Sequence, residues 1–157
     1  GFSLVRKLLL EQKGYKLQDH VAELGGILGD VLLEPTKIYV KSILALLDQI
    51  EIKGMAHITG GGFIENIPRM LPAGVNVGIE YGSWPIHPIF TLMQREGGIS
   101  NNDLFRTFNM GIGMVVVVSA EQAEEALRIA GKLGEKAYRI GTVTTGQQVV
   151  TFKGAVV

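Results

Sequence analysis

Three consecutive glycines, Gly60 to Gly62, carry the clearest chemical signal in the sequence. They stand between an apolar segment, 54–58, that is typical of a strand and a pattern over 63–70 that is typical of a helix. Glycines have no Cβ atom to block an anion, so their N–H groups and the positive end of the following helix can bind a phosphate. The alternative is a tight turn that needs positive φ angles, and the glycines alone favour neither.

The glycine motif differs from the common nucleotide-binding signatures. No Lys-Ser or Lys-Thr pair follows it, and the Gly-x-Gly-x-x-Gly spacing of dinucleotide sites is missing. Gly111 and Gly113 also lack a third glycine, and they lead into a strand instead of a helix. We expect these two glycines to let the backbone pass close to a neighbour, with Asn109 offering its amide at the end of the sheet.

Four polar residues could act together with the glycines. His57 ends the predicted strand, where an imidazole can donate to a phosphate or move a proton near neutral pH. Asn66 and Arg69 share a helix face, and Arg69 can bind a phosphate bidentately. Thr36 is expected in the first turn of another helix, which also accepts anions. Three of them have an ordinary structural alternative: His57 as a core or capping histidine, Arg69 as a surface arginine and Thr36 as a capping threonine.

Other classes of site are missing from the sequence. Without cysteine or a His-Glu-x-x-His pattern we expect no bound transition metal. The four aspartates are not clustered, so no magnesium-nucleotide site built from several carboxylates is visible. Fifteen basic residues balance fifteen acidic ones, and no apolar run approaches the ~18 residues of a membrane span. We therefore expect a cytoplasmic protein that binds neither nucleic acid nor membranes.

Periodicity and capping patterns predict the elements that position these residues. Helices are predicted over 2–13, 17–28 (a weaker pattern), 35–50, 63–70, 88–96 and 120–132, with a helical turn over 102–106. Ser3, Pro35 and a capping box of Ser119 with Gln122 are expected at helix starts. Strands are predicted over 54–58, 75–80, 113–118, 137–143 and 148–152, the last two joined as a hairpin through 144–146. The 157 residues then form a single α/β (α+β) domain, a mixed β-sheet with helices packed on it.

Four sequence blocks resemble the C-terminal half of the phosphoribosylformylglycinamidine cyclo-ligase family, also called aminoimidazole ribonucleotide synthetases. They are residues 1–7 (GFSLVRK), 33–41 (LEPTKIYVK), 57–69 (HITGGGFIENIPR) and 106–114 (RTFNMGIGM). The blocks occur in the family's order and together span nearly the whole chain. The resemblance implies a layered sandwich with partly ferredoxin-like βαββ topology, which is one half of a two-domain enzyme of purine biosynthesis.

The resemblance also implies a reaction and a set of partners. The full enzyme would use ATP to activate the formyl amide oxygen of formylglycinamidine ribonucleotide as an iminophosphate, after which an amidine nitrogen closes the imidazole ring and phosphate leaves. ATP and magnesium would be bound mainly by the N-terminal domain, which this chain lacks. We therefore expect the isolated chain to be inactive and to fold without a cofactor. The expected partners are the phosphorylated ribonucleotide substrate, the N-terminal domain and a second copy in a full-length homodimer.

Together with the resemblance, the phosphate interpretation of the glycines becomes the favoured one. A phosphate of substrate or nucleotide would be bound by Thr59, Gly60, Gly61, Gly62, Asn66 and Arg69, with Thr36 and Asn109 lining the same cleft. His57 would carry a proton or stabilise an oxyanion during ring closure. Two alternatives stay open: a sibling ATP-dependent enzyme such as selenophosphate synthetase, and a non-catalytic ligand-binding module. The blocks at 35–41 and 106–111 favour the cyclo-ligases over the siblings.

Overall fold

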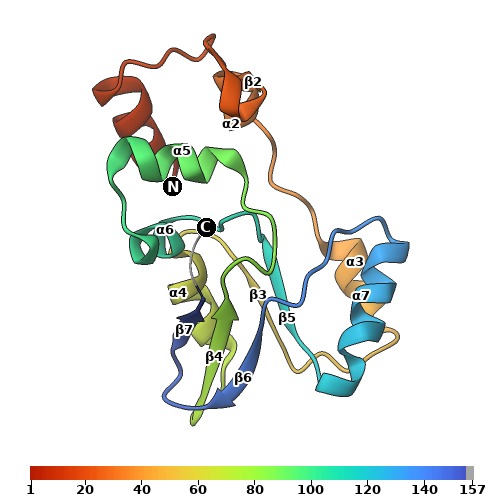
Figure 1. Ribbon diagram of the computed structural model, residues 1–157. Coiled ribbons are helices and arrows are strands. Elements are labelled where there is room, and N and C mark those ends of the chain that lie inside the picture. The colour runs from red at the N-terminus through yellow and green to blue at the C-terminus, as the bar shows by residue number, and fades with distance from the viewer. Residues whose placement is uncertain (155–157) are drawn as a thin grey trace.

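The computed structural model describes residues 1–154, and its first element is one continuous helix (Figure 1). The α-helix α1 (Phe2–Val5) continues directly into the π-helix η1 (Arg6–Gln12), which confirms the predicted helix. Val5, Leu8 and Leu9 are buried on its inner side. The N-cap is Gly1, without a side-chain hydrogen bond, so the predicted cap at Ser3 is wrong. Ser3 already lies inside the first turn.

The segment predicted as a weaker helix over 17–28 folds differently. It contains the strand β1 (His20–Val21), the 3₁₀-helix η2 (Ala22–Leu24) and the strand β2 (Gly26–Ile27). Gly25, with a φ of 67°, turns the chain so that β1 and β2 pair antiparallel. The helix α2 (Leu28–Leu32) starts only where the predicted helix was expected to end. The two glycines at 25 and 26 thus break the helical pattern.

Helix α3 (Val40–Leu47) is shorter than the helix predicted over 35–50. Residues 34–39 form no regular element, so neither Pro35 nor Thr36 lies in a helical turn, and the predicted helix-start position of Thr36 is wrong. Helix α3 packs on α7 (Ala123–Lys132), which the 3₁₀-helix η4 (Ala120–Gln122) precedes. Figure 1 shows these two helices side by side at one edge of the molecule. Ser119 is the N-cap of η4, and its carbonyl accepts from the Gln122 amide at 3.1 Å. Its hydroxyl makes no capping bond to the backbone but donates to Gln122 Oε1 at 3.4 Å.

The main strands form two separate sheets. Strand β3 (Gly54–His57) pairs antiparallel with β5 (Met114–Val117), and His57 lies opposite Met114. Strand β4 (Val75–Glu80) is antiparallel to β6 (Gly141–Thr145) and parallel to β7 (Val150–Lys153). The α+β class and the mixed strand directions are confirmed, although β3 and β5 stand in a sheet of their own.

The predicted hairpin of the last two strands is wrong, because β4 lies between β6 and β7. The Asn76 side chain explains this order. Its Oδ1 accepts hydrogen bonds from the amides of Gln147 and Val149, at 2.7 and 3.1 Å. The amide of Gly146 also donates to the Gly74 carbonyl at 2.9 Å. The connection therefore wraps around the start of β4 instead of closing a two-strand turn.

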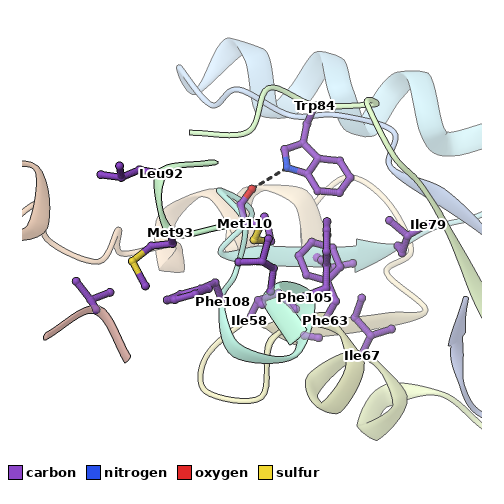
Figure 2. Close-up of a cluster of buried hydrophobic side chains, with 14 of the residues drawn as sticks. Ile58, Phe63, Ile67, Ile79, Trp84, Leu92, Met93, Phe105, Phe108 and Met110 are labelled. Atoms are coloured by element: carbon purple, nitrogen blue, oxygen red, sulfur yellow. Dashed lines mark hydrogen bonds between the residues drawn. The ribbon is translucent and has the colours of Figure 1, made fainter. Parts of the chain in front are cut away.

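The main core is built on aromatic side chains from short helices and loops (Figure 2). Phe63 stacks on Trp84, with ring centroids 5.6 Å apart, and Phe105 meets both rings edge-on. The Trp84 indole donates to the Met110 carbonyl at 2.9 Å. These residues come from α4 (Gly62–Asn66), α6 (Asn101–Thr107) and two loops. The core thereby fixes the loop 108–113 against the glycine motif.

The remaining helices follow the sequence patterns closely. The 3₁₀-helix η3 (Ile67–Met70) continues α4 and accommodates Pro68 in its first turn. Helix α5 (Pro88–Gly97) ends at Gly98, whose φ is 57°, and α6 begins at Ser100, whose hydroxyl accepts from the Asp103 amide. No helix within residues 1–154 combines the length and apolar character needed to cross a membrane.

Candidate functional site

The loop between β3 and α4 has a backbone that only glycine adopts easily. Gly61 and Gly62 have φ angles of 91° and 54°, and Gly61 is the N-cap of α4. A Cβ atom on Gly62 would lie 2.1 Å from the Phe105 carbonyl oxygen. A Cβ atom on Gly60 would meet no atom within 4 Å. Gly62 therefore serves close packing, whereas Gly60 lies open at the surface.

The side chain of Asn66 holds the glycine loop through hydrogen bonds. It is buried, and its Nδ2 donates to the carbonyls of Gly62, Gly60 and Thr59 at 2.8, 3.1 and 3.4 Å. Its Oδ1 accepts from the Thr59 hydroxyl at 3.4 Å. With three carbonyls turned toward Asn66, the N–H groups of Gly60 and Gly61 donate to no acceptor within residues 1–154. Asn66 thus organises the loop instead of projecting into a cleft.

Charged side chains of both signs border the glycine loop. Arg69 is exposed, and its Nη1 donates to Asn66 Oδ1 at 3.3 Å. The Glu65 carboxylate lies against Gly61, where an added Cβ would approach Glu65 Oε2 to 2.5 Å. Arg106 from α6 stands 3.5 Å from Glu65 Oε1. An anion at the loop would therefore meet two guanidinium groups and one carboxylate that is partly neutralised by Arg106.

His57 lies exposed at the end of β3, beside Tyr39. The two rings meet edge-on, with centroids 6.0 Å apart. The Tyr39 hydroxyl lies against Gly113, where an added Cβ would be 2.1 Å away. Burial raises the pKa of the Tyr39 phenol, and the nearby Lys37 charge only partly opposes this, so the hydroxyl is neutral at physiological pH. His57 and Tyr39 thus border the start of β5.

The loop 108–113 lies on the other side of the glycine motif. Asn109 Oδ1 accepts from the Gly111 amide at 3.0 Å, so this side chain mainly shapes its own turn. The preceding Phe108 carbonyl would be 2.8 Å from a Cβ on Gly62, which places Asn109 next to the glycine loop. A Cβ on Gly111 would lie 2.8 Å from the His87 ring. The prediction that Gly111 and Gly113 allow close approach of a neighbour is confirmed.

Thr36 is the predicted site residue that lies apart from the others. It is exposed on the irregular segment 34–39, three residues before Tyr39. Within residues 1–154 no hydrogen bond links its side chain to the glycine loop. The other predicted residues lie on three consecutive pieces of one surface: the end of β3, the glycine loop with α4, and the loop 108–113.

The polar cluster of Lys37, Ser42 and Glu135 escaped the sequence analysis. The Glu135 carboxylate accepts from the Ser42 hydroxyl at 2.6 Å and forms an ion pair with Lys37. Lys37 and Ser42 hold the pKa of Glu135 below its ordinary value near 4.5. The cluster ties the segment before α3 to the loop after α7. Sequence separations of 98 and 93 residues explain why no local pattern indicates it.

The donor groups at this surface suit a phosphate better than a metal ion. Within the described 154 residues no three His, Cys, Asp or Glu side chains gather as metal ligands. Magnesium prefers carboxylate oxygens and water, which this surface does not concentrate. Backbone N–H groups and arginine side chains, in contrast, are typical phosphate ligands. The surface can therefore bind a phosphate but offers no carboxylate set for magnesium.

Comparison with known proteins gives one family model and several curated relatives. The model described as "AIR synthase related protein, C-terminal domain" matches residues 1–153. The phosphoribosylformylglycinamidine cyclo-ligase of Shouchella clausii is 59% identical over 150 residues, which are 96% of this chain and 44% of that protein. The cyclo-ligase of Brevibacillus brevis is 53% identical over 154 residues, 98% of this chain and 44% of that protein. The chain thus spans less than half the length of these relatives.

Proposed function

Because the chain belongs to the family described as AIR synthase related protein, C-terminal domain, we propose that it is one domain of an ATP-dependent cyclo-ligase. The full protein would convert formylglycinamidine ribonucleotide to aminoimidazole ribonucleotide by closing a C–N bond of the imidazole ring. Identities of 53–59% to two proteins named as this cyclo-ligase support the assignment along nearly the whole chain. A selenophosphate synthetase-like sibling is the weaker candidate, because the relatives named here are cyclo-ligases.

The glycine loop would bind a phosphate group of the substrate or nucleotide. The observation that carries this proposal is the orientation that Asn66 imposes: three loop carbonyls point to its amide, and the N–H groups of Gly60 and Gly61 stay free of protein acceptors within residues 1–154. Backbone N–H groups bind anions without adding charged residues, which agrees with the balanced charge of the chain. Arg69 and the Thr59 hydroxyl would add donors at the rim.

The other predicted residues would act at the margins of the same surface. His57 would hold or donate a proton during ring closure, because its imidazole is exposed at the end of β3. Asn109 borders the loop on the opposite side, and Thr36 would reach the substrate only from the irregular segment 34–39. ATP and magnesium would be held mainly by the part of the full protein outside this chain. ATP supplies the phosphoryl group that activates the amide oxygen.

The isolated chain would accordingly bind ligand without turnover, in agreement with its lack of a metal-ligand cluster among the described residues. In the full protein we propose a homodimer in the cytoplasm.

A turnover assay of the 157-residue chain with ATP and formylglycinamidine ribonucleotide tests whether the isolated chain is inactive. Product formation by the chain alone would show that the other domain is not required.

An amide-resolved NMR titration tests the phosphate site directly. The 157-residue chain is titrated with inorganic phosphate and then with formylglycinamidine ribonucleotide. We expect the amides of Gly60 and Gly61 to shift, while Gly74, a glycine of positive φ in another turn, stays unchanged. Shifts confined to other parts of the chain would refute the assignment.

The role of His57 needs the complete enzyme. The matched part of the Shouchella clausii relative is replaced by this chain, and the turnover of the resulting chimera is compared with that of its His57→Ala variant. We expect kcat to fall by at least about a hundredfold, the lower end of the typical contribution of a general acid or base. An unchanged kcat would remove His57 from catalysis but would leave the phosphate site untouched.

A further inference from the structure

The outer face of helix α3 is apolar and exposed. Val40, Leu44 and Leu47 recur at helical spacing and are 63%, 56% and 45% exposed. Ile38, just before the helix, is 80% exposed. The opposite side of the helix is buried, because Leu46 packs in a small core with Ile129 of α7. Contiguous apolar side chains of this kind mark interaction surfaces, since single exposed ones are the rule elsewhere.

A groove of about 490 Å³ connects this face to the candidate site. Ile38, Val40 and Leu44 line the groove, and so do His57 and Met114 from β3 and β5. His57 ends the strand that leads into the glycine loop. Whatever covers the groove therefore borders the surface to which we assign phosphate binding.

We propose that the part of the full-length cyclo-ligase lying outside this chain docks on this surface, the α3 face, defined by Ile38, Val40, Leu44, Leu47 and the groove to His57. The proposal rests on the proposed function, since it takes the chain to be one domain of that enzyme. The relatives are more than twice as long as the matched region, so a polypeptide of sufficient size exists to cover the face.

The composition of the site favours this occupant over a second copy of the chain. Residues 1–154 contain no group of metal-ligating side chains, whereas ATP-dependent chemistry needs carboxylates near the transferred phosphoryl group. A second copy would bring another glycine loop but no such carboxylates. Docking at a groove that ends at His57 would place the missing groups beside the glycine loop.

Hydrogen–deuterium exchange of the chimera with the Shouchella clausii protein tests the proposal. We expect the amides of 40–47 to exchange at least about tenfold more slowly in the chimera than in the isolated chain, because docking suppresses local opening. Equal exchange rates in the two proteins would overturn the proposal. The exchange measurement needs no turnover, so it tests docking separately from the proposed function. Protection in an inactive chimera would support docking and refute the proposed function. Turnover without protection would support the proposed function and overturn the docking proposal.

Paired substitutions give the matched control. In the chimera, Leu44→Lys with Leu47→Lys should abolish the protection of 40–47, whereas Ile27→Lys with Val149→Lys should preserve it. Ile27 and Val149 are 42% and 45% exposed, and neither lines the groove or the larger cavity beside α3. Sedimentation of the isolated chain covers the remaining occupant: a dimer that Leu44→Lys dissociates, with no added protection in the chimera, would assign the face to a second copy and overturn the proposal.

Discussion

Two segments beside the candidate site are held in place by different kinds of contact. The glycine loop is held by Asn66, and every bond between them spans seven residues or fewer. The segment 34–39 is held by distant partners: Lys37 pairs with Glu135, 98 residues away, and Tyr39 packs on Gly113. The glycine loop is thus shaped largely by its own sequence, whereas the second segment depends on the rest of the fold.

This difference has consequences for stability and for prediction. A locally bonded loop keeps its conformation as long as its few side chains and glycines are intact. A segment held by distant contacts loses its conformation when either partner or the intervening fold changes. Substitutions at Gly62 and Asn66 should nevertheless have larger effects than substitutions of the contacts that hold 34–39, because both residues are buried whereas Lys37 is about half exposed.

The largest effect is expected for Gly62→Ala. The new Cβ would lie 2.1 Å from the Phe105 carbonyl oxygen, and alanine would have to adopt a φ of 54°. Strain and overlap together should lower the free energy of unfolding by about 2–4 kcal/mol. Urea denaturation measures the loss. Gly60→Ala is the control, because its Cβ meets no atom within 4 Å, and it should change stability by less than about 0.5 kcal/mol. Equal losses for the two variants would contradict the geometry.

The next effect is expected for Asn66→Ala. The substitution leaves the buried Gly62 carbonyl and the partly buried Gly60 carbonyl without their donor, which should cost about 1–3 kcal/mol of stability. It should also abolish the phosphate-induced NMR shifts of Gly60 and Gly61. Asn102→Ala on the exposed side of α6 is the control and should change neither quantity. A stable Asn66→Ala variant with unchanged phosphate shifts would show that the loop does not need this brace.

A smaller effect is expected for Gly113→Ala, which tests the segment 34–39. The Cβ would overlap the Tyr39 hydroxyl, so Tyr39 must move away, at a cost of about 1–2 kcal/mol. In a Tyr39→Ala background the same substitution should cost clearly less, because the overlapping ring is gone. A double-mutant cycle measured by urea denaturation gives the coupling. Strictly additive effects would show that Tyr39 does not pack on Gly113.

The smallest effect is expected for Glu135→Gln, and it depends on pH. Lys37 and Ser42 lower the pKa of Glu135, so the charged carboxylate stabilises the fold at pH values above its ordinary pKa near 4.5. This contribution is lost as the pH falls below 4.5 through the lowered value. Because Lys37 is about half exposed, the difference in unfolding free energy at pH 7 should stay below about 1 kcal/mol, and it should shrink as the pH falls below 4.5.

Glu125→Gln provides the matched control for this pH dependence. Glu125 pairs with Arg128 one turn away in α7, and its side chain is more exposed to solvent than that of Glu135, so its contribution should be smaller than that of Glu135. Urea denaturation of both variants at several pH values makes the comparison. A destabilisation by Glu135→Gln that stays unchanged as the pH is lowered from 7 to well below 4.5 would show that the charge on Glu135 does not stabilise the segment.

Much of the fold around the candidate site could be predicted from local patterns. The strand before the glycines, the strand β4 and the helix ending at Gly98 follow from alternation, helical spacing and capping residues. The glycine loop itself was predicted between strand and helix. The brace by Asn66 was missed, because an asparagine on a helix gives no sign of whether its amide points to a ligand or to the preceding loop.

Two of the wrong predictions, the helix expected from Pro35 and the C-terminal hairpin, share a physical cause. The helix expected from Pro35 starts only at Val40, where the contacts of Lys37 and Tyr39 with distant partners end. The hairpin expected at the C-terminal end is split, because the Asn76 side chain binds the connecting loop around β4. In both regions tertiary contacts outweigh a weak local preference.

The sequence by itself determined the residue types of the glycine loop, most helix and strand positions and the resemblance to the cyclo-ligase family, since these depend on local spacing and on matching blocks. Only the tertiary structure decided which predicted residues meet, that Thr36 stands apart from the glycine loop, and that α3 presents an apolar outer face. Such pairings depend on which distant surfaces become buried together, and a local pattern of side chains does not specify which distant segment packs against it.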